Sequence, residues 1–256
     1  MNASTSPPTT TAIGRTMTIA RREFRAYFNT PLAAVFLVIF LFLAAFMTFN
    51  VGGLFDRGQA DLRPFFQFHP WLYLFLVPAV SMRLWAEEGR SGALELLLTL
   101  PAPTWALVLG KFLAAWTIAA AALLLTAPLW VTLNVLGDPD NAAIFTAYLS
   151  SLLMAGAYIA IGSAMSALTQ TQIVAFVLAV LASFLITALG LPLVLDFVAG
   201  FIDAGIAEAL ARFSILHHFD AAQRGVVEFR SVFYFASLIA LCLTATALAV
   251  DARRGG

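Results

Sequence analysis

The stretch Asn141–Leu195 reads NAAIFTAYLSSLLMAGAYIAIGSAMSALTQTQIVAFVLAVLASFLITALGLPLVL and contains no charged residue and no histidine. A helix that crosses a bilayer needs about 20 mainly apolar residues. Since a helix rises about 1.5 Å per residue, these 55 residues are too many for one crossing. The polar tetrapeptide Thr169-Gln-Thr-Gln172 divides the stretch. We therefore expect two spans joined by a tight turn.

Apolar stretches in the rest of the chain bring the prediction to six transmembrane helices. The predicted spans lie near residues 32–51, 65–83, 105–135, 144–168, 173–195 and 231–250. The chain is 61% hydrophobic and only 11% charged, whereas soluble domains are about 45–50% apolar and about 25% charged. This composition excludes a soluble globular enzyme, and 14 basic residues balanced by 14 acidic ones exclude a nucleic-acid surface. The predicted fold is an all-α polytopic membrane protein.

The two ends of the chain and its basic residues predict domain limits and topology. Residues 1–16 (MNASTSPPTTTAIGRT) lack the apolar core of a signal peptide, so we expect a disordered tail. Residues 17–256 then form one six-helix transmembrane domain. With both termini placed inside, nine Lys and Arg residues lie inside and five outside. The positive-inside rule therefore predicts cytoplasmic termini.

The segment 17–29 (MTIARREFRAYFN) has an aromatic face and a basic face at helical spacing. Phe24 belongs to the first face, and Arg21, Arg22 and Arg25 belong to the second. Such a pattern predicts a helix that lies in the membrane interface, ended by Pro31. A simple positively charged anchor is the alternative interpretation.

The predicted cytoplasmic loop 83–111 carries a charged cluster followed by a leucine-rich run at 94–100. The charged cluster contains Glu87, Glu88, Arg90 and Glu95. Apolar surface on a cytoplasmic helix indicates a docking partner, because a protein rarely leaves such surface in water. The alternative is that the leucine run lies in the membrane interface.

The predicted external segment 196–230 has apolar residues at helical spacing, which predicts one or two short amphipathic helices before the last span. The spacing of His217, His218 and Asp220 favours interfacial packing over a metal site. The middle of each predicted span is free of charged residues, which argues against a proton-coupled or ion-coupled transporter.

Three segments resemble the ABC-2 type permease family. The most specific is 78–101 (PAVSMRLWAEEGRSGALELLLTLP), with Leu109-Gly-Lys-Phe112 after it. The segments 23–31 (EFRAYFNTP) and 218–226 (HFDAAQRGV) support it. The pattern is most similar to the branch of the gliding-motility permease GldF and, more distantly, the copper-maturation permease NosY. Ala34 departs from the pattern, since an aromatic residue is expected there.

The resemblance implies a permease subunit that forms a membrane pathway, for export, in the bacterial inner membrane. It implies a second permease copy or a paralogue, and separate ATP-binding cassette ATPase subunits that hold ATP and Mg²⁺. An auxiliary extracytoplasmic protein is a further partner that it allows. The loop 83–111 would hold the coupling helix, with Glu87, Glu88, Arg90 and Glu95 at or near the ATPase surface.

The resemblance also implies a dimer contact near the first and fifth spans. Its seam would be formed by Phe36, Phe40, Phe176 and Phe184, for which lipid contact is the alternative. The sequence contains no G-x-x-x-x-G-K-[ST] motif, so we expect neither ATP hydrolysis nor a cofactor or metal on this chain. A stand-alone secondary transporter and a force-transmitting membrane anchor remain as alternatives, and the substrate stays open.

Overall fold

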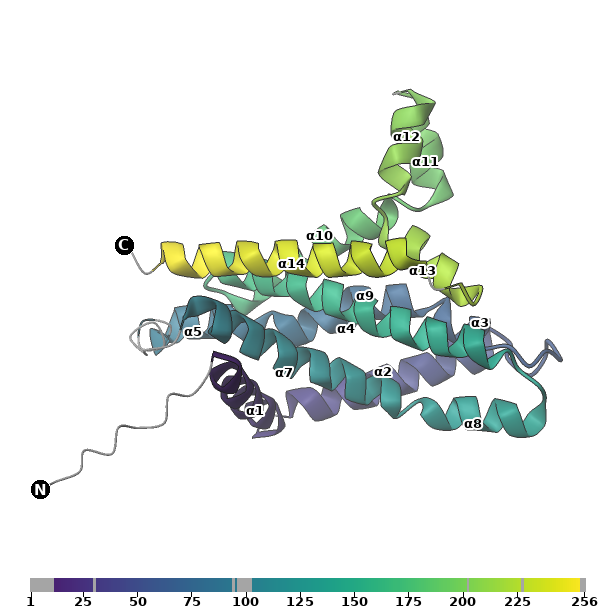
Figure 1. Ribbon diagram of the computed structural model, residues 1–256, viewed down its shortest axis with the longest axis horizontal. Helices are drawn as coiled ribbons and strands as arrows, with labels where there is room; N and C mark the ends of the chain where they lie inside the picture. The colour runs from purple at the N-terminus through teal and green to yellow at the C-terminus, as the bar shows by residue number, and fades with distance from the viewer. Residues whose placement is uncertain are drawn as a thin grey trace, which may run out of the picture.

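The computed structural model describes residues 12–29, 31–93, 95, 103–201, 203–226 and 228–253. All regular structure in these residues is helical, which confirms the predicted fold class. The long helices are α2 (Leu32–Phe46), α4 (His69–Ser81), α7 (Thr104–Leu124), α9 (Asn141–Leu168), α10 (Gln172–Ala188) and α14 (Phe229–Ala252). They run side by side along one axis (Figure 1).

Short helices join and cap the long ones. These are the π-helical turn η1 (Met47–Val51), α3 (Arg63–Phe66), α5 (Arg83–Ser91), α8 (Ala127–Leu136), α11 (Pro192–Ala199), α12 (Ala204–Ala211) and α13 (Ile215–Gln223). In the described part of the chain, five helical segments are long and apolar enough to cross a membrane. A sixth is present if α10 and α11 form one span, bent by 74°.

Two predicted spans are interrupted. The predicted span 173–195 ends as a helix at Ala188, and Pro192 begins α11 in a new direction. Proline favours the first turn of a helix because it needs no N–H partner there. The predicted span 105–135 is interrupted between α7 and α8, near Pro128, but Thr104–Leu136 still forms one segment long and apolar enough to cross a membrane. Pro128 marks this interruption in the sequence, whereas the break in the span 173–195 was not predicted.

Helix α9 is the centre of the bundle, because α4, α7, α10 and α14 all pack against it. Small residues let these helices approach closely, as is usual for helices in lipid. A Cβ atom at Gly162 of α9 would overlap the side chain of Ser81 on α4, so no larger residue fits at this crossing.

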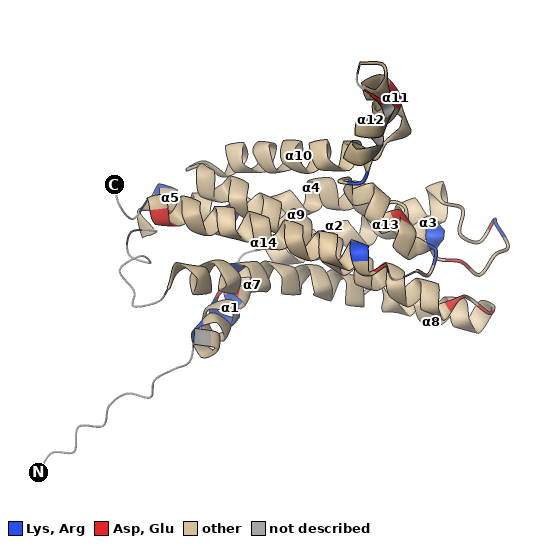
Figure 2. Ribbon diagram, turned by 45° about the horizontal axis from the view of Figure 1, so that its top comes forward, with Lys and Arg blue, Asp and Glu red and all other residues tan. Residues whose placement is uncertain are grey.

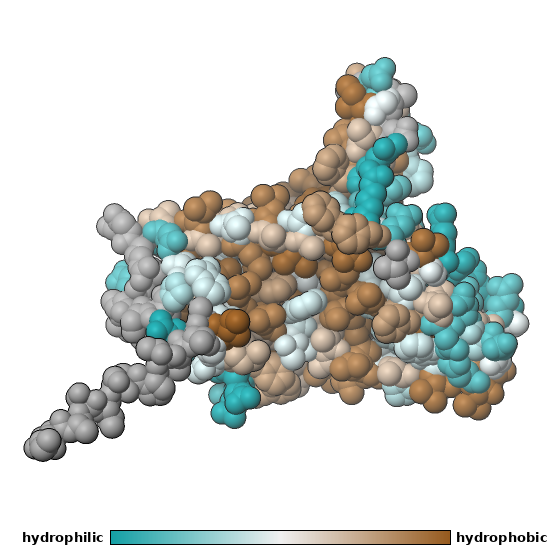
Figure 3. All heavy atoms as spheres, in the orientation of Figure 1, coloured by the Kyte–Doolittle hydropathy of each residue, from teal (hydrophilic) through white to brown (hydrophobic). Residues whose placement is uncertain are grey.

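The outer surface between the two ends of the bundle is apolar (Figure 3). Large exposed side chains include Val38 and Phe42 on α2, Leu181 on α10 and Leu241 on α14. Lys, Arg, Asp and Glu gather at the two ends instead (Figure 2). Such a belt suits hydrocarbon better than water, so the chain is a membrane protein.

The first helix, α1 (Ala12–Asn29), lies across one end of the bundle and packs against α7 (Figure 1). Gly110 of α7 makes this contact possible, since a Cβ atom there would lie 2.6 Å from Cγ2 of Ile19. The helix includes residues 12–16, so the predicted domain limit at residue 17 moves to Ala12. The rest of the predicted tail, residues 1–11, lies outside the described residues.

Three short helices, rather than the predicted one or two, precede the last span. Of these, α11 and α12 project from the bundle, whereas α13 packs back on α9 and α14 (Figure 1). His218 of α13 is buried, with Nδ1 3.1 Å from Ser231 Oγ and Nε2 2.9 Å from the Arg212 carbonyl. Burial lowers the pKa of His218. Both ring nitrogens are thus engaged in hydrogen bonds inside the protein.

Candidate functional site

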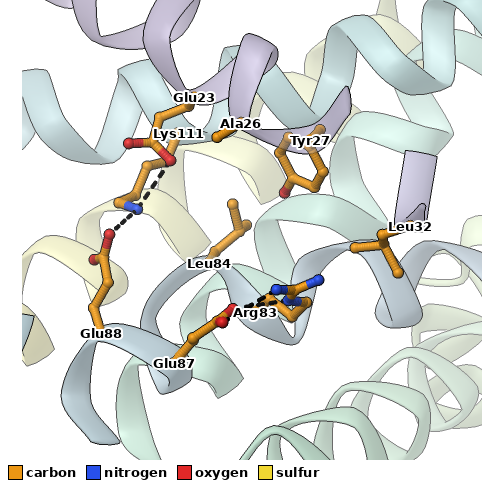
Figure 4. Close-up of a pocket in the computed structure, with 9 residues that line it drawn as sticks. All are labelled: Glu23, Ala26, Tyr27, Leu32, Arg83, Leu84, Glu87, Glu88 and Lys111. Carbon is orange, nitrogen blue, oxygen red and sulfur yellow. Dashed lines mark hydrogen bonds and ion pairs between the residues drawn. The ribbon is translucent and has the colours of Figure 1, made fainter. Parts of the chain in front are cut away.

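The candidate site is a cavity of about 170 Å³ between α1, α5 and α7, at the end of the bundle where the C-terminal end of α14 also lies (Figure 4). The lining residues are Glu23, Ala26, Tyr27, Leu32, Arg83, Leu84, Glu87, Glu88 and Lys111. Most of its polar atoms belong to two groups of ion pairs, and each group has a different exposure to solvent.

Lys111 of α7 lies at the centre of the first group. Its Nζ atom is 2.6 Å from Oε1 of Glu88 on α5 and 3.3 Å from Oε2 of Glu23 on α1. It also lies 5.3 Å from the ring centroid of Trp85. The Lys111 side chain is only 3% exposed. Since a buried ammonium is costly without partners, these contacts hold three helices together at one point.

Glu23 stays ionised in this position. Burial raises its pKa, but the nearby Lys111 ammonium and the Arg22 guanidinium outweigh that effect and leave the pKa below its ordinary value. The Arg22 guanidinium contacts the carboxylate at 2.8 Å. The negative charge of Glu23 is therefore neutralised from both sides, and its side chain is turned toward the protein.

The second group is the pair of Arg83 and Glu87 on the outer side of α5. The two side chains meet at 2.8 Å across one helical turn, and the Glu87 side chain is 48% exposed. An exposed pair of this kind contributes little to stability. Arg90 and Glu95 are exposed as well. These three residues, Glu87, Arg90 and Glu95, are available to a partner.

Glu88 differs from this group of predicted coupling residues. The sequence placed it at or near the partner surface, but the structure turns its carboxylate inward onto Lys111, where the side chain is 19% exposed. The reason is helical geometry, because successive residues on a helix point about 100° apart. The leucine run used in the same prediction, Leu94 and 96–100, lies outside the described residues.

Helix α5 is fixed to α9 through two serines. Ser166 Oγ accepts hydrogen bonds from the backbone N–H groups of Trp85 at 3.1 Å and Ala86 at 3.0 Å. The same hydroxyl donates to the Met82 carbonyl at 2.7 Å. A side chain from another helix thus caps the first turn of α5, whose free N–H groups need partners. Ser163 Oγ adds a hydrogen bond from the Trp85 indole at 3.0 Å.

The predicted interfacial residues of α1 lie as follows. Arg21, Arg22 and Arg25 are exposed, and Phe24 is half-buried. The buried side of the helix is formed by Thr16, Ala20 and Tyr27. Phe28, which the sequence pattern placed on the aromatic face with Phe24, is 54% exposed. The apolar side of α1 is therefore only partly used in packing against the bundle.

The four residues of the predicted dimer seam also differ in their burial. Phe36 and Phe40 are 5% and 0% exposed inside this one chain, so neither can reach a second copy. This part of the prediction is wrong because α2 turns these rings toward α4, where Phe40 stacks on Tyr73 at 5.8 Å. On α10, Phe176 is half-buried and Phe184 is 42% exposed. For these two residues the seam stays a prediction.

Sequence reasoning missed several residues of the site, namely Glu23, Trp85, Lys111, Ser163 and Ser166. One signal was present, since Lys111 is the single lysine of the chain and is followed by a long apolar run. An ionisable residue in such a run usually has a partner inside the protein. The serines gave no comparable signal, because small residues also serve ordinary helix packing.

Comparison with known families agrees with the membrane fold. A family model described as ABC-2 family transporter protein matches residues 72–253, which include α5, α9 and Lys111. A comparison with curated proteins gives no match for this chain. The matched region covers well over half of the chain and includes most of its apolar helices. The chain therefore belongs to the ABC-2 family of transporter proteins.

Proposed function

We propose that this chain is the permease subunit of an ATP-binding cassette exporter and that a separate ATPase subunit drives it. Family membership supports a membrane component of such a transporter. The observation that carries the proposal is the two-sided character of α5. Its outer side presents Glu87 and Arg90, while its inner side is bound to α7 and α9. ATP and Mg²⁺ would be held by the ATPase, and this chain would hold no cofactor or metal.

A push on α5 would reach the membrane helices by two routes. The hydrogen bonds of Ser166 connect α5 to α9, the central helix of the bundle. The Glu88–Lys111 ion pair connects α5 to α7, and the Lys111–Glu23 pair continues to α1. Energetic coupling between distant sites can follow such chains of contacts between rigid helices. Glu87 and Arg90 would receive the push, and Glu88 would transmit it.

The remaining features of the proposal follow from the family and the charge distribution. The end with α1 and α5 faces the cytoplasm of a bacterial inner membrane, because it holds the larger number of Lys and Arg residues. A second copy or a paralogue completes the pathway, with Phe176 and Phe184 of α10 at the seam. The GldF and NosY branch is the subfamily that we propose, and an auxiliary extracytoplasmic protein would meet the α11–α13 end.

The proposal is tested by purifying the chain together with the ATP-binding cassette ATPase encoded nearest to its gene. We expect a stable complex whose ATPase activity differs from that of the ATPase alone. Reversing the outer charges of α5 with Glu87→Lys and Arg90→Glu should weaken the complex. The matched control is Arg230→Glu, an exposed residue in the first turn of α14, whose opposite end lies beside α5 (Figure 1). An unchanged complex with the α5 variant, or an equal loss with the control, would refute the coupling role of α5.

The two alternatives make different predictions in the same experiment. A stand-alone secondary transporter would move its substrate into vesicles without any ATPase. A force-transmitting anchor would stimulate the ATPase but would show no transported substrate that alters its rate. A screen of lipids, glycans and peptides for effects on the ATPase rate therefore separates both alternatives from the exporter.

A further inference from the structure

The exposed side of α1 carries two adjoining stripes of different chemistry. Ile13, Met17 and Phe28 form an apolar stripe, in which the side chains are 77%, 56% and 54% exposed. At 3.6 residues per turn, Arg21 and Arg25 follow directly beside this stripe, and both are exposed. The side that packs on α7 is a third, separate side of the helix. A helix with this pattern suits the boundary between headgroups and acyl chains.

The exposed side of α1 is cationic because the protein removes the one negative charge of this helix. Glu23 is the single acidic residue in Ala12–Asn29. Its carboxylate is turned inward to Lys111 and is also bound by Arg22. Arg21 and Arg25 have no ion-pair partner among the residues that the structure describes. Two guanidinium groups thus remain uncompensated on the same side of the helix.

These residues line a groove of about 690 Å³ that runs along α1. Met17, Thr18, Arg21, Arg25 and Asn29 contribute to it. Two arginines one helical turn apart can both reach one phosphate, and the planar guanidinium matches phosphate oxygens well. Because α1 lies across the end of the bundle (Figure 1), lipid headgroups would lie at the level of this helix.

We propose that this groove binds an acidic phospholipid of the adjacent leaflet. Arg21 and Arg25 hold the phosphate and the anionic headgroup, and an acyl chain lies along Met17 and its apolar neighbours. Charge complementarity selects an anion, and the apolar stripe beside the arginines selects an amphiphile over free phosphate. The site needs no ATPase, so it stands apart from the proposed transport function.

Lipid retention by the purified full-length chain tests the proposal. The chain is equilibrated in mixed micelles of phosphatidylglycerol and phosphatidylcholine, and the retained lipids are counted by native mass spectrometry. We expect preferential retention of phosphatidylglycerol and a loss of about tenfold in Arg21→Gln/Arg25→Gln. The matched control, Arg57→Gln/Arg230→Gln, removes the same charge at the opposite end and should retain the lipid. Arg21→Lys/Arg25→Lys should keep most of the preference.

A second measurement leaves both arginines in place. A fluorophore is attached to Thr18→Cys in a Cys242→Ala background, and its quenching by brominated lipids is recorded. We expect stronger quenching by brominated phosphatidylglycerol than by brominated phosphatidylcholine, with no relief by inorganic phosphate. Equal quenching by the two lipids, equal retention in the Arg21/Arg25 and control variants, or displacement by phosphate would overturn the proposal.

Discussion

The carboxylate of Glu88 lies 2.6 Å from the ammonium group of Lys111, although the two residues belong to different helices, α5 and α7. Lys111 also contacts Glu23 of α1, so the removal of this one side chain would break both ion pairs that link α7 to α1 and α5.

Lys111→Met should lower the thermal stability of the purified chain, by about 3 kcal/mol, because it leaves two carboxylates without their shared partner. Fluorescence-detected size-exclusion chromatography after heating measures the effect. The triple variant Glu23→Gln/Glu88→Gln/Lys111→Met should recover much of the loss, since no unpaired charge remains. If Lys111→Met alone is as stable as the original chain, the ion pairs do not hold the helices together.

Glu87→Lys and Glu88→Lys should affect different properties, although the two residues are adjacent in the sequence. Glu87 is exposed, so its reversal should disturb the complex with the ATPase while the chain stays folded. Glu88 faces Lys111, so its reversal should place two cations together and destabilise the permease itself. Thermal stability and co-purification are measured for both variants. The assignment fails if the two show the same pattern.

Gly162→Ala should destabilise the chain by about 1–3 kcal/mol, because its methyl group would overlap the side chain of Ser81. Ser81→Gly in the same chain should restore part of the stability by removing the contact. Ala245→Val adds volume on an exposed part of α14 and serves as the control. Heating curves compare the three, and a neutral Gly162→Ala would contradict the tight crossing of α4 and α9.

Single cysteines should report the orientation in a Cys242→Ala background. Cysteines at Gln59 and Asp138 should react with an impermeant thiol reagent added to intact cells, whereas those at Ser91 and Gln170 should not. All four positions are exposed, so access depends on the side of the membrane. Labelling at Ser91 in intact cells would reverse the topology.

The seam can now be probed at one side of α10. Phe184→Cys should cross-link two copies in native membranes, because its side chain is exposed on a helix that would face the second copy. Leu241→Cys on α14 replaces a residue that is even more exposed, 66% against 42% for Phe184, and should cross-link less. Phe40→Arg is unsuitable for this purpose, since a charge in the packed interior should unfold the chain. Equal cross-linking at both positions would place the seam elsewhere.

Long apolar runs such as Asn141–Leu195 predict the spans well, because length and the absence of charge suffice for that purpose. The direction in which a side chain points can be predicted only when the positions of the neighbouring helices are known as well. From the sequence, Phe36 and Phe40 are expected at a dimer seam, with lipid contact as the alternative, but both are buried inside the chain. Glu87 and Glu88 look alike in the sequence, and only the position of Lys111 separates their roles.

The cap that Ser166 places on α5 restricts how this protein can be engineered. The first turn of α5 depends on a hydroxyl group supplied by α9, from a serine 81 residues after Trp85 in the chain. A chimera that received α5 from a related permease would lose this support unless the matching positions of α9 came with it. The unit that must be exchanged or inherited together is therefore the pair of α5 and the α9 segment around Ser163 and Ser166, rather than the loop alone.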